Sequence, residues 1–164
     1  MKKVILATII SAFVLASCQK HNDELYKTET VTTADATISK SGWQSVSLQG
    51  GTPNARGLAT SVALLPAKAI NEDVLADGIV LLFGKTDATV NTLPFSGSGT
   101  DWNYNVSNGV IDLSVSSSNS LSTASVLYVI LNTAQVSALE KSGYSRNDLL
   151  NISYEKAKVL FGLE

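Results

Sequence analysis

Cysteine and histidine are nearly absent from this chain of 164 residues, which contains only Cys18 and His21. A single cysteine excludes a disulfide within one chain, so the packing of the core must supply the stability of the fold. Because both residues precede position 36, the rest of the chain cannot form the Ser-His-Asp or Cys-His groups of nucleophilic catalysis. It also cannot bind zinc through histidine or cysteine. We therefore expect no enzyme activity, no metal and no cofactor.

Charged residues are also few, at 16% of the chain, and they form no cluster of cations. Lys and Arg number 12 against 14 Asp and Glu, and removal of residues 1–17 with Lys2 and Lys3 would leave a formal charge of −4. Since binding to phosphates requires a concentration of positive charge, we expect no nucleic-acid partner. Hydrophobic residues make up 45% of the chain, which is typical of a globular protein.

The first 17 residues have the three parts of a bacterial export signal. Lys2 and Lys3 are positively charged, residues 4–14 are mainly apolar, and small residues follow them. The apolar segment is shorter than the roughly 20 residues that a membrane-spanning helix needs. A buried N-terminal strand or helix is the alternative, but the order of charged and apolar residues favours export. We therefore expect residues 1–17 to be a signal peptide.

Cys18 ends the sequence Leu15-Ala16-Ser17-Cys18, which resembles the lipobox of bacterial lipoproteins. The resemblance implies that the thiol of Cys18 carries a diacylglycerol, that the signal is cleaved before it, and that acyl chains hold the protein in a membrane. Two or more acyl chains give firm anchoring, at roughly 0.8 kcal/mol per buried methylene. The alternative is an ordinary secretory signal that leaves a free thiol, which is a liability in an oxidising compartment.

The residues after Cys18 bear on where the protein is located. Residue 19 is Gln rather than the Asp that retains lipoproteins in the inner membrane, so the resemblance implies the outer membrane. Residues 18–24 combine a lysine with acidic residues and resemble the export tag of small Bacteroidetes surface lipoproteins, which favours display at the cell surface. Residues 18–35 are polar, so we expect a lipidated flexible tether before a single β-rich domain over 36–164.

Short apolar or alternating segments after residue 36 indicate β-strands. The expected strands are residues 36–40, residues 43–50 and residues 58–65, the last of which ends at Pro66. Turn residues predict a loop over 50–54. Residues 79–83 and 126–131 have no polar side, so each segment predicts a central strand that is covered on both faces.

Residues 102–115 predict a β-hairpin around Asn108-Gly109, a pair that is typical of type I′ turns. The predicted apolar pairs are Val106–Ile111, Tyr104–Leu113 and Trp102–Val115, and the predicted polar pairs are Asn105–Asp112 and Asn103–Ser114. A shift of one residue would destroy this match, so the pattern predicts the register as well as the turn.

Helical segments are fewer than strands. The expected helices lie within 67–76 before Gly78, from Asn132 or Thr133 to about Ser142, and over 154–161 with Ser153 as the N-cap. Residues 146–152 are ambiguous, and residues 116–125 indicate a loop. Short strands at close spacing with few helices favour an all-β fold, namely an antiparallel β-sandwich with a short C-terminal helical element.

Two clusters of oxygen-bearing side chains are candidates for calcium binding. The first cluster is Asn71, Glu72, Asp73 and Asp77, and the second is Asp101, Asn103 and Asn105. The spacing of the first does not match an EF-hand, which favours solvated carboxylates of a helical turn. The second alternates with apolar residues, which favours a strand. No two carboxylates can be identified from the sequence as the pair that a glycosidase requires.

Three classes of function remain open. The anchor, the tether and the missing catalytic residues favour a non-catalytic interaction module of the cell envelope, whose partner is a protein or an envelope component. A glycan-binding module is the alternative, because Trp43, Trp102 and Tyr104 could stack on sugars if they were exposed. The hairpin pattern instead predicts that Trp102 and Tyr104 face a core, and Trp43 is better explained as a core or edge aromatic. A small envelope hydrolase is the least favoured class.

Overall fold

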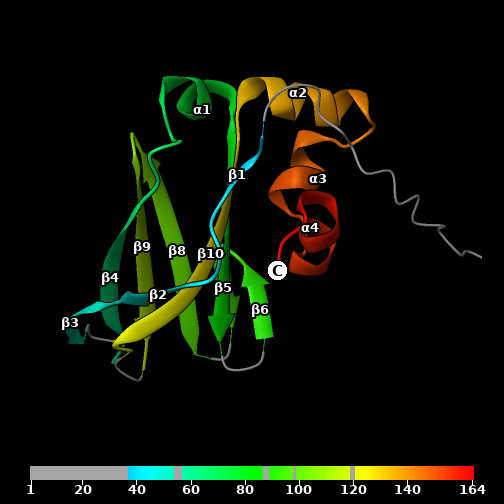
Figure 1. Ribbon diagram of the computed structural model, residues 1–164. Helices are drawn as coiled ribbons and strands as arrows, with labels where there is room; N and C mark the ends of the chain where they lie inside the picture. Colours follow the sequence, from blue (N-terminus) through cyan, green and yellow to red (C-terminus); the bar gives the residue numbers. More distant parts are fainter. Residues whose placement is uncertain (1–36, 54–56, 87–88, 98, 119–120) are drawn as a thin grey trace, which may run out of the picture.

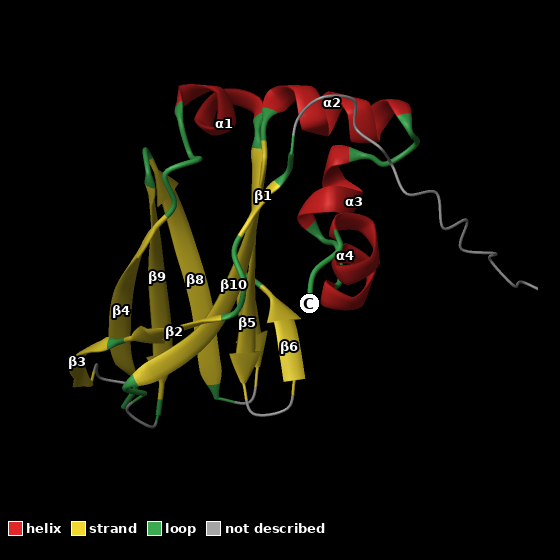
Figure 2. Cartoon of the chain, viewed as in Figure 1, coloured by secondary structure: helices red, strands yellow, loops and turns green. Residues whose placement is uncertain are grey.

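The computed structural model of the protein describes residues 37–53, 57–86, 89–97, 99–118 and 121–164. These residues form two five-stranded antiparallel sheets and four short helices (Figures 1 and 2). The sheets stack face to face, and the three helices after the last strand pack on the outside of one of them. The predicted all-β sandwich with a C-terminal helical element is therefore confirmed.

The two sheets are called sheet A and sheet B below. Sheet A has the strand order β1 (Ser39–Lys40), β10 (Thr123–Leu131), β5 (Ile79–Thr86) and β6 (Thr89–Thr92), and β2 (Gln44–Ser47) also pairs with β10. Sheet B has the order β3 (Gln49–Pro53), β4 (Ala59–Pro66), β9 (Val110–Ser117), β8 (Thr100–Ser107) and β7 (Phe95–Gly97). All of these neighbouring strands are antiparallel.

Strands β5 and β10 lie side by side in sheet A and are covered on both faces. Their inward side chains, such as Leu82 and Val126, join the core between the sheets. Their outward side chains, such as Phe83 and Val129, pack against the helical layer. The helices of this layer are α2 (Thr133–Lys141), α3 (Arg146–Leu150) and α4 (Tyr154–Phe161), whereas α1 (Glu72–Asp77) precedes β5. The prediction of two central strands without a polar side is therefore confirmed.

Strands β8 and β9 form the predicted hairpin with the predicted register. The observed pairs include Val106–Ile111, Tyr104–Leu113, Trp102–Val115, Asn105–Asp112 and Asn103–Ser114. Gly109 in the turn has a φ of +74°, a left-handed conformation that glycine adopts without the steric cost of a Cβ. The apolar side of this hairpin faces sheet A and contributes Trp102, Leu113 and Val115 to the core.

The chain crosses from sheet A to sheet B at Leu48, which corrects two predictions. A single strand over 43–50 was wrong because β2 belongs to sheet A and β3 to sheet B. The loop over 50–54 was wrong because β3 pairs with β4 through a shift of register, which accommodates its turn-forming residues. Leu48 itself is buried, and its N–H donates to the carbonyl oxygen of Ser122 at 2.8 Å.

A second crossing joins β6 to β7 at the cis peptide bond between Leu93 and Pro94. Leu93 is buried, and its N–H donates to the carbonyl oxygen of Leu82 at 2.8 Å. The side chains of Leu48 and Leu93 both belong to the core between the sheets. Each pair of sheet edges is thus joined by a connection whose leucine is inserted into the core.

Each helix begins at a side-chain cap that accepts a hydrogen bond from the backbone N–H three residues later. The four capping residues are Asn71, Asn132, Ser145 and Ser153. The predicted helices after Asn132 and Ser153 are confirmed, and the ambiguous segment 146–152 contains α3. Within the segment 67–76 that was predicted to contain a helix, the helix begins only at Glu72, the first residue of α1. The predicted loop 116–125 is wrong at both ends, because β9 runs to Ser117 and β10 begins at Thr123.

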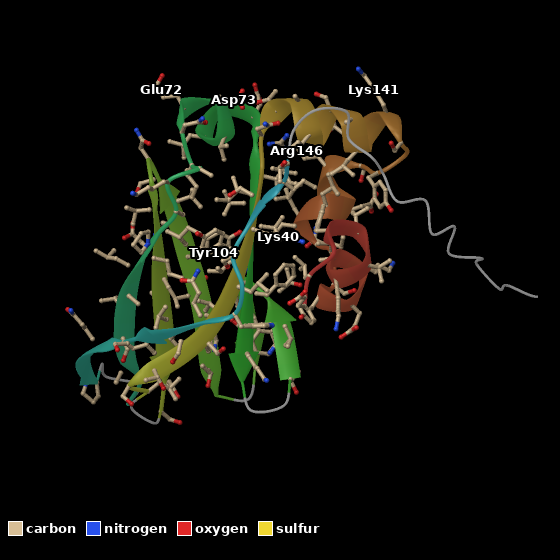
Figure 3. All side chains as sticks on the ribbon, in the orientation of Figure 1. Lys40, Glu72, Asp73, Tyr104, Lys141 and Arg146 are labelled. Carbon is tan, nitrogen blue, oxygen red and sulfur yellow. The ribbon has the colours of Figure 1, made fainter. Side chains whose placement is uncertain are left out.

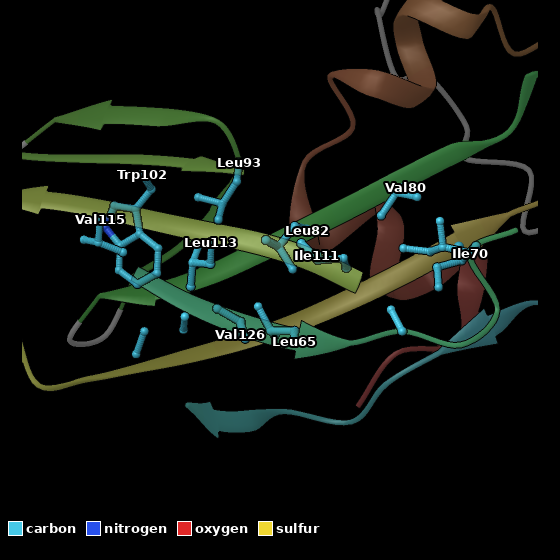
Figure 4. Close-up of a cluster of buried hydrophobic side chains, with 14 of the residues drawn as sticks. Leu65, Ile70, Val80, Leu82, Leu93, Trp102, Ile111, Leu113, Val115 and Val126 are labelled. Carbon is cyan, nitrogen blue, oxygen red and sulfur yellow. The ribbon is translucent and has the colours of Figure 1, made fainter. Parts of the chain in front are cut away.

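Trp102 packs against the backbone of β5 in the core between the sheets (Figure 4). A Cβ at Gly84 would lie 3.1 Å from both Cε3 and Cζ3 of the indole ring. Since this separation is shorter than ordinary van der Waals contact, glycine at position 84 lets the ring approach the strand this closely.

We expect Gly84→Val to destabilise the protein, because the added side chain would overlap the indole ring of Trp102. The free energy of unfolding should fall by about 1–3 kcal/mol, the usual effect of overpacking a core. Urea denaturation followed by tryptophan fluorescence measures it. Gly42→Ala is the matched control, because within the described ranges no atom lies within 4 Å of a Cβ there. Equal stability of the two variants would contradict this packing.

Candidate functional site

The predicted lipidation site, Cys18, lies outside the described residues. The predicted signal peptide 1–17, the predicted tether 18–35 and His21 lie outside them as well. The assignments of an anchor and a tether therefore stay predictions.

Lys40 of β1 links the beginning of the described chain to the helical layer. Nζ of Lys40 donates to the carbonyl oxygens of Phe161 at 2.9 Å and of Gly162 at 2.6 Å, at the end of α4 (Figure 3). These carbonyl groups lack partners within the helix, and a cation at this end also interacts favourably with the helix dipole. Lys40 therefore has a structural role.

The aromatic residues considered as a sugar-stacking surface do not share an exposed face. Trp102 is 2% exposed, and the hydroxyl of Tyr104 donates to the carbonyl oxygen of Val80 at 2.8 Å. Burial raises the pKa of Tyr104 above its ordinary value. Trp43 is half-buried, and its ring centroid lies 5.7 Å from that of Tyr154 in a tilted arrangement. The prediction that the hairpin aromatics face a core is confirmed.

The acidic cluster around α1 joins this helix to its neighbours. Oδ2 of Asp73 accepts a hydrogen bond from the N–H of Thr133 at 3.3 Å, and the Thr133 hydroxyl donates to the Asp73 carbonyl at 3.2 Å. Arg146 donates to the carbonyl oxygens of Asp77 and Gly78 at 3.0 and 2.7 Å (Figure 3). Among the residues that the structure describes, no three His, Cys, Asp or Glu come together in a way that could hold a metal ion.

A surface groove of about 760 Å³ lies between α3 and α4. The exposed Val159 contributes to its apolar lining, but polar groups around it serve the helices. Ser145 and Asp148 form a capping box, and the hydrogen bond from Ser145 holds the pKa of Asp148 below its ordinary value. Nδ2 of Asn151 donates to the Asn147 carbonyl at 2.9 Å. Much of the polar lining of the groove therefore forms hydrogen bonds within α3 or at its ends.

The outer face of sheet B carries no helix in the described part of the chain (Figure 1). We call it the open face and define it by the outward side chains of β4, β8 and β9. These are Thr60, Val62, Leu64, Pro66, Asp101, Asn103, Asn105, Ser107, Val110, Asp112, Ser114 and Ser116. The predicted strand position of Asp101, Asn103 and Asn105 is confirmed, and it places all three on this face.

Strand β4 supplies aliphatic side chains to the open face. Leu64 is 70% exposed and Val62 is 48% exposed. The inward side chains of the same strand are mostly small: Ala59, Ser61, Ala63 and Leu65. Small residues fit there because the interior is filled by Leu113 of the neighbouring strand β9 and by Trp102 of β8, the next strand beyond it. Val62 and Leu64 are thus left in contact with solvent, whereas Leu65 is buried.

The charge on the open face is negative. Asp101 and Asp112 are the only charged residues in the strands of sheet B, which contain no Lys or Arg. Asp112 pairs with Leu64 across β4 and β9, so a carboxylate lies beside the most exposed aliphatic group of the face. The hydroxyls of Thr60 and Ser116 lie 2.8 Å apart, within hydrogen-bond distance.

The open face was not identified from the sequence. Segment 58–65 predicts an apolar strand, and its pairing with β9, about 50 residues later, determines which neighbours its outward side chains have. One signal was present, because small and large residues alternate along β4. That alternation distinguishes two sides of the strand without showing which of them is buried.

Comparison of the chain with protein-family models, with curated proteins and with solved structures finds no match in any of the three. None of the helices in the described ranges has the length and apolar character needed to cross a membrane.

We expect Tyr104→Phe to lower the free energy of unfolding by about 1 kcal/mol, because the carbonyl group of Val80 would lose a hydrogen-bond donor. The pKa of Tyr104 is raised in the folded state. Its contribution to stability is therefore complete below the ordinary tyrosine pKa of about 10 and is lost as the pH rises through the higher folded-state pKa.

Absorbance titration of the phenol groups tests the assignment of the raised pKa to Tyr104. Wild type should contain a tyrosine that ionises above the ordinary range, and Tyr104→Phe should remove it. Tyr144→Phe is the control, since Tyr144 lies at the surface of the helical layer. Loss of the late-ionising group in the Tyr144→Phe variant instead would show that the assignment to Tyr104 is wrong.

Proposed function

We propose that this protein is a lipid-anchored component of the cell envelope whose folded domain binds another polypeptide and catalyses no reaction. The single observation that carries the binding role is the exposure of Leu64 and Val62 on the open face, beside the polar side chains of β8 and β9. Contiguous exposed apolar patches that are bordered by polar residues mark protein interaction surfaces.

The proposed anchor is supported by the sequence around Cys18 and by the spacing to the domain. Eighteen residues separate Cys18 from Thr37, where the described chain begins. A fully extended chain of this length spans at most roughly 60 Å. Such a tether would let the domain reach partners well beyond the lipid surface. The proposed location in the outer membrane, with display at the cell surface, depends on the resemblance of residues 18–24.

The proposed lack of catalysis is supported by the residues of the domain. Residues 37–164 contain neither histidine nor cysteine. Asp73 joins α1 to α2, and Asp148 caps α3, so both have structural roles. We favour a polypeptide over a glycan as partner, because the side chains best suited to stacking on sugars, Trp102 and Tyr104, face the interior.

Cys18→Ala should release the protein from the membrane fraction and abolish its labelling by a fatty-acid analogue, because the acyl chains would have no attachment site. Cell fractionation followed by immunoblotting and by detection of the label measures both effects in cells that express the full chain. Ser17→Ala is the matched control, because it keeps a small residue before the cysteine and keeps the thiol. Retention of Cys18→Ala in the membrane fraction would overturn the proposed anchor.

A further inference from the structure

We infer that the open face binds a cationic polypeptide segment that carries aliphatic side chains. This inference rests on the proposed function and names the class of partner for it. It depends on three features of the fold: the short outermost strands of both sheets, the aliphatic groups of β4, and the sign of the charge on the open face.

The outermost strands of the two sheets offer little for strand addition. β7 has three residues, β6 has four, and β3 contains Pro53 and a shift of register. At the other edge of sheet A, β1 has two residues and β2 has four. Short, irregular edges of this kind oppose the pairing of a further strand. These outermost strands therefore favour contact of a polypeptide partner with a face, although β7 pairs with only Thr100–Trp102 and leaves Asn103–Ser107 of β8 without a strand partner on that side among the described residues.

The aliphatic part of the open face suits contact with a partner's own aliphatic groups. Val62 and Leu64 are two residues apart on β4, so their side chains lie on the same side of the strand, about 7 Å apart. Pro66 is exposed and extends the same side of the strand. A partner that covered these groups would remove apolar surface from water, which favours association.

The charge of the open face selects a cationic partner. Asp112 is paired with Leu64, and Asp101 is paired with Ser116 on the same side of the sheet. The strands of sheet B contribute no cation that could neutralise either carboxylate. Complementary charge speeds encounter and excludes partners of the wrong sign. Lysine and arginine also carry aliphatic stems, which can lie along Leu64 while the charged end reaches Asp112.

Photocrosslinking in intact cells tests which face is occupied. A benzophenone amino acid is placed at position 64 or at position 159 of the full chain. Leu64 is 70% exposed and Val159 is 72% exposed, so the two positions are equally accessible but lie on different faces of the protein. We expect a discrete adduct with a polypeptide from position 64 and none from position 159.

The alternative outcomes separate the two proposals. An adduct from position 159 alone would overturn the assignment to the open face and leave a polypeptide-binding function intact. The lack of an adduct from both positions would overturn the binding function itself. Mass spectrometry of the adduct from position 64 then identifies the crosslinked polypeptide and the segment that carries the link.

Binding of the identified polypeptide to the purified full chain then tests whether the charge of the open face contributes to the affinity. The affinity of wild type should fall as the salt concentration rises, and Asp112→Lys should weaken binding by about tenfold or more. Asp112→Asn, which preserves the shape of the side chain, should give a smaller loss with a weaker dependence on salt. Glu140→Lys makes the same change of charge on α2 and should leave the affinity unchanged. Thermal unfolding shows whether each variant is folded.

An acidic crosslinked segment, an affinity independent of salt, or equal effects of Asp112→Lys and Glu140→Lys would each overturn the inference of a cationic partner. A variant of Asp112 that fails to fold is replaced by Asp101→Asn, which tests the second carboxylate of the open face. An unchanged affinity in that variant together with an unchanged dependence on salt would also overturn it.

Discussion

The pairing of β5 with β10 is the interaction on which the rest of the structure depends. Seven consecutive residue pairs join these strands, from Ser125–Lys85 to Leu131–Ile79. Their side chains are largely apolar on both faces, so the pair requires a covering layer on each side. Sheet B provides one layer and α2, α3 and α4 provide the other. The helices have five to nine residues and are too short to be stable alone, so they depend on the same contact.

This layering leaves few surfaces for binding. Crossings at Leu48 and Leu93 join the edges of the sheets, and basic side chains of Lys40 and Arg146 occupy the ends of α4 and α1. Much of the polar lining of the groove between α3 and α4 serves helix caps. The open face combines exposed aliphatic groups with carboxylates, a combination that gives apolar contact area together with a preference for one sign of charge.

Predictions from the sequence succeeded where the signal was local. The register of the β8–β9 hairpin follows from Asn108-Gly109 and from matched pairs within 14 residues. The caps at Asn132 and Ser153 act over three residues. Predictions failed where distant strands decide the outcome: Leu48 separates two strands because β2 and β3 pair with β10 and β4, and Ser117 belongs to a strand because β4 and β8 flank it.

The β-sandwich class, the two strands covered on both faces and the lack of histidine and cysteine after residue 36 follow from the amino-acid sequence. It also supplies the basis for the proposed anchor at Cys18. The exposure of Leu64 and Val62 and the position of Asp112 beside Leu64 depend instead on the pairing of distant strands. The physical reason is that alternation along a strand defines two sides, whereas the side that becomes buried depends on how the neighbouring strands fill the core. Leu113 of β9 and Trp102 of β8 occupy the interior on the side of Ala63, so Val62 and Leu64 point outward while Leu65 remains buried.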